Sequence, residues 1–250
     1  MDELLLLCGF AFFAGLVDAV AGGGGLIQVP ALFALFPAAE PAMLLGTNKV
    51  SSIAGTAAAV VRYARNVPIP SRSLRSAAIG AALGSVLGAW SISYLPAEAV
   101  RGVVVLLLVL VGGYVWIHGR FGLARQGHSQ AWPGGQVAYC TGLGFYDGFL
   151  GPGTGSFLIF GLVRWFRHDF LEAASYAKVI NLTTNAGALG YFAAAGKVDL
   201  GIGIPMAVAN LVGGYLGASA AVRRGAPFIR KVFLLVTAAL IAKMALDLSD

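Results

Sequence analysis

The 250-residue chain has few charged side chains, with 17 Lys and Arg and 11 Asp and Glu, or 11% of its residues. A soluble domain carries about 25% charged residues, whereas this chain is 58% hydrophobic and has a mean hydropathy of +0.81. This small number of charged side chains cannot cover the surface of a soluble protein. We therefore expect an integral membrane protein in a lipid bilayer. This composition excludes a nucleic-acid-binding protein despite the formal net charge of +6, because basic loops explain that charge.

The chain also lacks the residue groups that enzymes and metalloproteins use. Its two cysteines, Cys8 and Cys140, lie in apolar stretches without metal-ligand spacing. Its three histidines lie in polar stretches, and no glycine run is followed by the Lys-Ser/Thr pair of a phosphate-binding loop. We therefore expect no enzyme activity, no metal and no cofactor. Without a nucleotide site, any transport must be driven by a gradient.

Apolar segments fill most of the chain. A membrane-spanning helix needs about 20 residues, so the length predicts an all-α polytopic membrane protein with eight to ten transmembrane or half-membrane helices. A polar connector at 118–133 separates a first membrane repeat, 1–117, from a second, 134–250. The first two segments of each half are short, so they are either tilted spans or re-entrant hairpins. The expected segments are 4–20, 24–37, 42–61, 73–95, 99–117, 136–150, 154–163, 172–195, 201–222 and 229–246.

The two halves repeat at a constant spacing of 129 residues, which separates Asp18 from Asp147 and Lys49 from Lys178. The same spacing aligns several glycines, such as Gly84 with Gly213. Low complexity could align glycines by chance, but charged residues inside apolar segments are rare. Their shared register therefore indicates an internal duplication.

The distribution of basic residues predicts how the halves are oriented. Four loops contain 12 of the 17 basic residues, around 62–75, 120–125, 164–167 and 223–231. If each half crosses the membrane an odd number of times, all four loops share one face, and Lys and Arg are enriched on the cytoplasmic face. This predicts two inverted repeats with a cytoplasmic connector and both termini on the non-cytoplasmic side, an arrangement found in many secondary transporters.

Four ionisable residues inside the apolar segments are the main candidates for function. Each has a cost of at least about 2.5–3.5 kcal/mol at the centre of a membrane helix. One interpretation is a structural ion pair within each half, Asp18–Lys49 and Asp147–Lys178. The other is that Lys49 and Lys178 bind an anion where the repeats meet, while Asp18 and Asp147 hold the lysines or carry coupling protons.

Glycine-rich breaks in both halves favour an anion site. Each break ends one helix and starts another, and the start of a helix presents free N–H groups and a positive dipole end. Paired breaks at matching positions are the best pointer from sequence to a transporter's binding site. The candidate binding residues in the breaks are Gly22, Gly23, Gly24, Gly151, Gly153 and Thr154, and the neutral candidates beside the lysines are Thr47, Asn48, Ser51, Asn181, Thr184 and Asn185.

Four strings carry a resemblance to a known family. They are GLVDAVAGGGGLIQVP at 15–30, GTNKVSS at 46–52, GFYDGFLGPGTGSF at 144–157 and AKVINLTTN at 177–185. These strings resemble the paired motifs of the TauE/SafE sulfite exporter family, and the similarity covers about residues 5–245. The second break departs from the family's run of three glycines, because here it reads Gly-Pro-Gly-Thr-Gly.

The resemblance implies a multi-pass permease of the inner cell membrane that moves sulfite, sulfonates or related sulfur-containing anions. We therefore expect a secondary transporter of a small anion that works by alternating access. Two alternatives use the same site, an uncoupled anion channel and a permease for carboxylates or other anions. A membrane-embedded assembly protein is a third. The direction of transport and the coupling ion stay open at this point.

Overall fold

The computed structural model describes residues 2–67, 71–96, 99 and 133–247. The expected segment 99–117 and most of the connector at 118–133 lie outside these residues. The described residues form helices and no strand, which confirms the all-α expectation, and the observed bounds lie close to the expected segments. The helices are α1 (Asp2–Ala21), α2 (Gly25–Leu35), α3 (Pro41–Ala64), α4 (Ser71–Ile92), α6 (Pro133–Phe149), α7 (Thr154–Arg164), α8 (Phe170–Ala194) and α9 (Leu200–Asp247).

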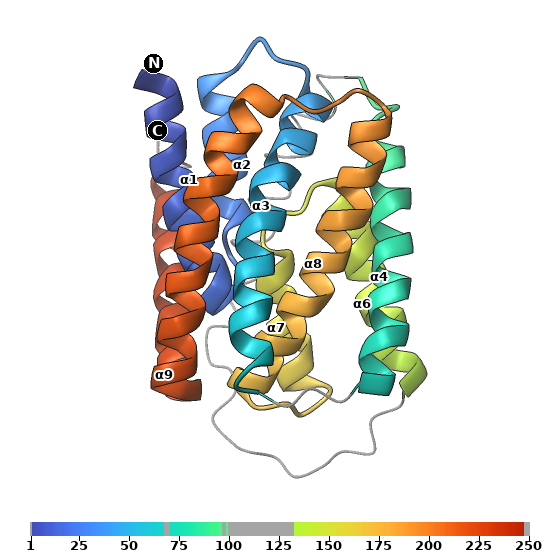
Figure 1. Ribbon diagram of the computed structural model, residues 1–250, viewed down its shortest axis with the longest axis vertical. Coiled ribbons are helices and arrows are strands. Elements are labelled where there is room, and N and C mark those ends of the chain that lie inside the picture. Colours follow the sequence, from blue (N-terminus) through green and yellow to red (C-terminus); the bar gives the residue numbers. More distant parts are fainter. Residues whose placement is uncertain (1, 68–70, 97–98, 100–132, 248–250) are drawn as a thin grey trace.

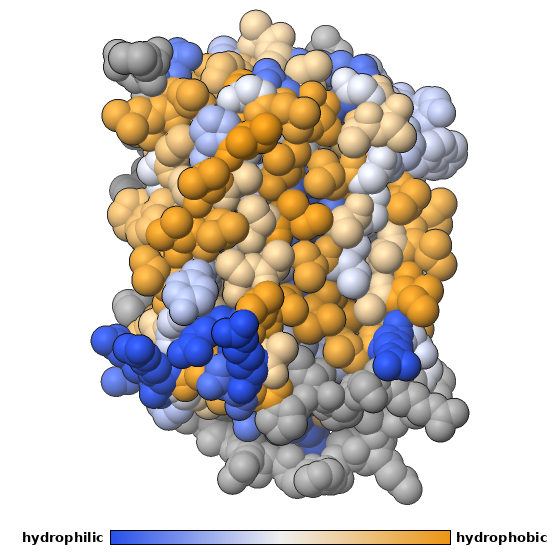
Figure 2. Space-filling view, in the orientation of Figure 1, coloured by the Kyte–Doolittle hydropathy of each residue, from blue (hydrophilic) through white to orange (hydrophobic). Residues whose placement is uncertain are grey.

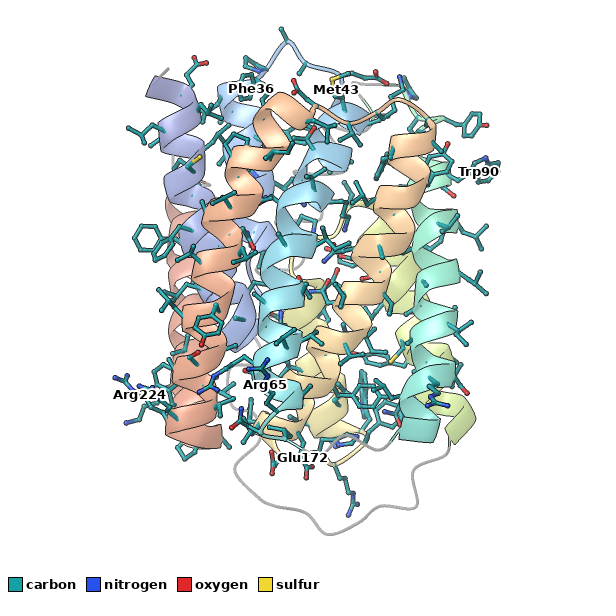
Figure 3. All side chains as sticks on the ribbon, in the orientation of Figure 1. Phe36, Met43, Arg65, Trp90, Glu172 and Arg224 are labelled. Carbon is teal, nitrogen blue, oxygen red and sulfur yellow. The ribbon has the colours of Figure 1, made fainter. Side chains whose placement is uncertain are left out.

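The two shortest helices belong to hairpins that enter and leave the bundle at one end. Helix α1 starts at the upper end in Figure 1, and Phe36, just after α2, and Met43, in α3, lie at that same end in Figure 3. Helices α6 and α7 form the corresponding hairpin from the lower end. Since α2 and α7 have 11 residues each, they are about 16 Å long, too short for a hydrocarbon core of about 30 Å. The lengths of α2 and α7 therefore do not fit two full spans in either pair, and they favour the re-entrant alternative.

The two long central helices run in opposite directions. Helix α3 descends from the upper end in Figure 1 and α8 ascends from the lower end. At the upper end, Lys197, after α8, donates hydrogen bonds of 2.7 and 2.6 Å to the carboxylate of Glu40, the N-cap residue of α3. The start of α3 therefore lies beside the end of α8.

The side chains are distributed as in a membrane protein, with apolar residues outside and polar residues inside. Leu6, Leu83 and Val208 are among many large hydrophobic side chains exposed on α1, α4 and α9, and an apolar surface covers the middle of the molecule in Figure 2. Among the described residues, two segments are long and apolar enough to cross a membrane, Glu3–Ala21 and Leu200–Ile229. The long helices α3 and α8 carry buried polar side chains on their inward faces, and these lower their mean hydropathy.

Basic side chains gather at one end of the molecule. Arg65 and Arg224 both lie at the lower end in Figure 3, where blue side chains form a patch in Figure 2. In the same region, Arg62 Nε donates a hydrogen bond of 3.1 Å to Ser219 Oγ. Helix α9 then breaks at Gly225, whose φ of 70° lies in the left-handed region that glycine adopts readily.

Each half packs its first helix against the last described helix of the other half. A Cβ at Gly213 of α9 would overlap the carbonyl of Phe12 in α1, and a Cβ at Gly84 of α4 would overlap the carbonyl of Thr141 in α6. Small residues allow helix backbones to approach this closely in membranes. The two contacts are related by the 129-residue spacing, so the halves interlock through matching interfaces.

Candidate functional site

The two glycine breaks meet inside the bundle. Ser156, in the first turn of α7, donates from its backbone N–H to the carbonyl of Gly22 at 3.0 Å and from its hydroxyl to the carbonyl of Ala21 at 2.8 Å. Gly22 has φ of 79°, and a Cβ there would overlap the backbone of Gly155. This position therefore needs glycine for both its conformation and its space. The C-terminal end of α1 thus lies directly against the N-terminal end of α7.

The second break has its own internal hydrogen bonds. Gly151 and Gly153 both have positive φ, at 93° and 81°. Thr154 Oγ1 donates to the carbonyl of Gly151 at 2.8 Å, and the hydroxyl of Tyr146 donates to the carbonyl of Pro152 at 2.6 Å. These bonds give backbone oxygens of the break hydrogen-bond partners, as the membrane interior requires.

Two buried ion pairs connect the halves. Lys178 Nζ in α8 lies 2.7 Å from Asp18 Oδ2 in α1. Lys49 Nζ in α3 lies 3.1 Å from Asp147 Oδ2 in α6, and it also donates to the Asp147 carbonyl at 2.7 Å. Both lysines are almost fully buried, at 0% and 2% exposed.

This pairing corrects the expected pairs within each half, Asp18–Lys49 and Asp147–Lys178. The physical reason is the depth of the hairpins. The first helix of each hairpin packs against the last described helix of the other half, so the aspartate near the hairpin tip meets that half's lysine. The 129-residue spacing relates the two observed pairs to each other.

A small cavity lies between the hairpin tips and the central helices. Its volume is about 20 Å³, room for roughly one water molecule. Nine of the expected site residues line it, and they include Lys49, both aspartates and parts of both glycine breaks. Its lining consists of Asp18, Gly22, Gly24, Gly25, Gln28, Asn48, Lys49, Ser52, Asp147, Gly151, Gly155, Asn181, Asn185 and Asn210.

The amide side chains beside the lysines connect α3 and α8. Asn185 Nδ2 lies 3.2 Å from Asn181 Oδ1 on the same helix and 3.4 Å from Thr56 Oγ1 on α3. Asn48, at 3% exposed, has a side-chain oxygen without a hydrogen-bond partner among the described residues. The cavity wall therefore contains polar groups that can bind a ligand.

Other expected site residues hold the surrounding structure. Thr47 Oγ1 accepts a hydrogen bond of 2.9 Å from the backbone N–H of Asp199, just before α9. Thr184 Oγ1 donates to the carbonyl of Asn181 on the same helix at 3.0 Å, and Thr184 is fully buried. Gly153 is the N-cap residue of α7. Ser51 is fully buried on α3, and Gly23 accepts a turn hydrogen bond of 3.1 Å from Leu26.

Two amide residues of the cavity were missed by the sequence reasoning. Gln28 of α2 and Asn210 of α9 both line the cavity, and Asn210 Nδ2 donates to Gln28 Oε1 at 2.8 Å. Neither has a polar counterpart at the 129-residue spacing, so the repeat did not mark them. An amide isolated in an apolar segment is the signal that could have identified them, because a polar group inside a membrane needs a partner.

Comparisons with known proteins place the chain in a family. The family model described as "Sulfite exporter TauE/SafE" matches residues 7–244. A relative from Sinorhizobium, "Probable membrane transporter protein ORF9", is 33% identical over 95% of this chain and 90% of its own length. The "Probable membrane transporter protein" of Haemophilus influenzae is 32% identical over 99% of this chain and 96% of its own length.

A third relative, "Probable membrane transporter protein YfcA" of Escherichia coli K12, is 32% identical over 97% of this chain and 91% of its own length. No solved structure matches the chain significantly. The family match extends over all four motif strings and over both hairpins of the structure. The chain therefore belongs to the sulfite exporter TauE/SafE family of membrane transporters.

Proposed function

We propose that this chain is a secondary transporter of a small anion, sulfite or an organosulfonate, and that it works by alternating access. The observation that carries this proposal is the pair of buried Lys–Asp contacts that join the two halves beside one polar cavity. Ionisable residues inside a membrane protein are costly, and they mark substrate or ion pathways. Membership of a family of sulfite exporters supports the substrate class.

The proposed framework is a pair of inverted repeats. The opposite directions of α3 and α8 support it, as do the matching contacts of Gly84 and Gly213 across the halves. The basic lower end, with Arg65 and Arg224, faces the cytoplasm by the enrichment of Lys and Arg there. Both termini then lie on the non-cytoplasmic side, and the protein sits in the inner cell membrane.

In this proposal the anion binds next to Lys49, on the cavity wall, with Lys178 at the symmetry-related position. Gly25 and Gly155, in the first turns of α2 and α7, supply backbone N–H groups, and Asn48, Asn181 and Asn185 supply side-chain amides. A sulfite or sulfonate group has three oxygens that accept hydrogen bonds and none that donates when ionised. A wall with several neutral donors and one accessible cation suits such a group.

Charge balance gives Asp147 and Asp18 a role in coupling. With both pairs ionised, two lysines and two aspartates have a net charge of zero, so an anion would bring an uncompensated charge into a buried site. Such a charge is strongly unfavourable in the low dielectric of the interior. A proton on Asp147 would remove this penalty and free Lys49 to pair with the anion. Anion and proton would therefore move together.

The small cavity corresponds to a closed conformation in this proposal. A three-oxygen anion needs more space than one water molecule, so the walls must separate before it can enter. The contact between Ser156 and Gly22 holds the hairpin tips together, and the cross-half ion pairs hold the halves. A bound anion that replaces the aspartate as the partner of a lysine would weaken this interface. Rocking between the two halves could then expose the site to one side of the membrane at a time.

Uptake into proteoliposomes tests the proposal. Purified protein would be reconstituted and given sulfite, sulfate, thiosulfate, sulfoacetate, taurine or small carboxylates, with and without a pH gradient. We expect saturable uptake of sulfite or a sulfonate that a proton gradient accelerates. Uptake without saturation and without response to the gradient would indicate an uncoupled channel, and uptake of carboxylates alone would change the substrate class.

A further inference from the structure

The cavity wall contains one amide pair that the repeat does not explain. Gln28 of α2 is 1% exposed and Asn210 of α9 is 4% exposed, and both line the cavity. Asn210 Nδ2 donates two hydrogen bonds, one to the backbone carbonyl of Ala11 at 3.0 Å and one to Gln28 Oε1 at 2.8 Å. Both amide hydrogens of Asn210 therefore have an acceptor.

These contacts fix which end of the Gln28 amide is available. The carbonyl of Ala11 can only accept, so the Asn210 atom facing it must be the nitrogen. The atom of Gln28 that receives the second hydrogen must then be its oxygen. Gln28 Nε2 is the remaining end of the amide, and it has no hydrogen-bond partner among the described residues. A buried amide nitrogen with two unused donors is unfavourable unless a ligand or water accepts from it.

The surrounding backbone is shaped to hold Asn210 in this position. A Cβ at Gly55 of α3 would overlap Asn210 Oδ1, and a Cβ at Gly15 of α1 would lie 2.9 Å from the same atom. Two glycines from two helices thus leave space for this one side chain. Asn210 is held by packing as well as by hydrogen bonds, so it presents Gln28 in a defined orientation.

The pair joins one residue of each half, and it has no counterpart under the internal duplication. At the 129-residue spacing, Gln28 corresponds to Phe157 and Asn210 corresponds to Ala81. The duplication therefore supplies no second amide pair to match the one that lines the cavity. If the pair served the repeated framework, we would expect an equivalent pair at the matching positions. A single pair is enough if its role is to bind one ligand.

We infer that Gln28 is a specificity-determining residue that donates from Nε2 to an oxygen of the bound oxyanion, and that Asn210 is the positioning residue that orients it. This inference rests on the proposed anion transport and adds to it. Because Nε2 offers directed donors rather than charge, Gln28 favours anions that present several acceptor oxygens, such as sulfite. A monatomic anion such as chloride has no separate acceptor oxygens, so the fixed directions of the two N–H groups of Gln28 Nε2 add less to its binding.

The test measures the KM for sulfite uptake and its inhibition by sulfonate and by chloride in proteoliposomes. Gln28→Glu keeps the size of the side chain and an oxygen for Asn210, but it removes the donors. Gln28→Met removes the amide without adding a charge, so it covers the case in which the glutamate variant fails to fold. Gln136→Met is the matched control, since Gln136 is a buried amide of α6 outside the cavity lining.

We expect Gln28→Met to raise the KM for sulfite about 10- to 100-fold, the range of a hydrogen bond to a charged group. Its maximal rate should change little, and the preference for sulfite over chloride should fall. Asn210→Leu should give a smaller shift in the same direction, and Gln136→Met should leave the KM unchanged. An unchanged KM in both Gln28 variants would overturn the inference while leaving anion transport intact. Absence of uptake in the unmodified protein would instead overturn the proposed function.

Discussion

Lys49 of the first half and Asp147 of the second form a buried contact, with Nζ 3.1 Å from the carboxylate and 2.7 Å from the backbone carbonyl of the same aspartate. Lys178 of the second half and Asp18 of the first make the symmetry-related contact, with Nζ 2.7 Å from the carboxylate. Each pair therefore joins the halves and lies at or next to the cavity. A ligand that competes for either lysine acts on the interface between the halves.

Replacement of Lys49 alone should affect stability as well as transport. Lys49→Met leaves Asp147 buried without its cation, and breaking a buried ion pair in this way costs about 3–5 kcal/mol. We expect a clearly lower midpoint of thermal unfolding in detergent. The double variant Lys49→Met/Asp147→Asn removes both charges, so it should recover most of that loss.

Transport separates the structural role of the pair from its role in binding. The double variant should be folded but should show no anion uptake, because no cation remains on the cavity wall. If the double variant carried sulfite as fast as the unmodified protein, the pair would serve only to hold the halves together.

The tip of the first hairpin should tolerate no larger residue at Gly22. Gly22→Ala places a Cβ against the backbone of Gly155 and in a left-handed conformation that alanine adopts poorly. We expect loss of folded protein, measured as the monodisperse fraction in size-exclusion chromatography. Gly142→Ala is the control, because a Cβ there meets no atom of the described residues within 4 Å. Since alanine favours helices over glycine by about 0.5–1 kcal/mol, this variant should be at least as stable as the unmodified protein.

The ion pair between Lys197 and Glu40 at the upper end should contribute little to the stability of the fold. Lys197 and Glu40 are only partly covered, with side chains 33% and 45% exposed, and exposed pairs contribute about 0–1 kcal/mol. Glu40→Gln should shift the unfolding midpoint only slightly and leave uptake unchanged. A loss as large as that of Lys49→Met would show that this exposed contact contributes as much to stability as the buried pairs, against the expectation.

Labelling of single cysteines tests the proposed orientation. Glu40 is the N-cap residue of α3, which starts at the upper end of the molecule in Figure 1, and Glu172 lies at the lower end in Figure 3. Both side chains are partly exposed. In a variant without Cys8 and Cys140, Glu40→Cys should react with a membrane-impermeant maleimide added to intact cells. Glu172→Cys should react only after the membrane is opened. The reverse pattern would place the basic end outside.

The sequence predicted the helices, the two breaks and the four buried charges because each leaves a local pattern in composition or spacing. It did not predict the partners of Asp18 and Asp147, since spacing along the chain does not tell which half a hairpin tip enters. It also did not predict the amide pair of Gln28 and Asn210. These residues lie 182 positions apart, and only the fold brings them together.

The role of the Lys49–Asp147 pair in transport is decided by sulfite uptake into proteoliposomes with an inward proton gradient, measured for the unmodified protein and for the Lys49→Met/Asp147→Asn variant. We expect saturable, gradient-stimulated uptake by the unmodified protein and background uptake by the folded variant. Equal uptake by both proteins would contradict this role.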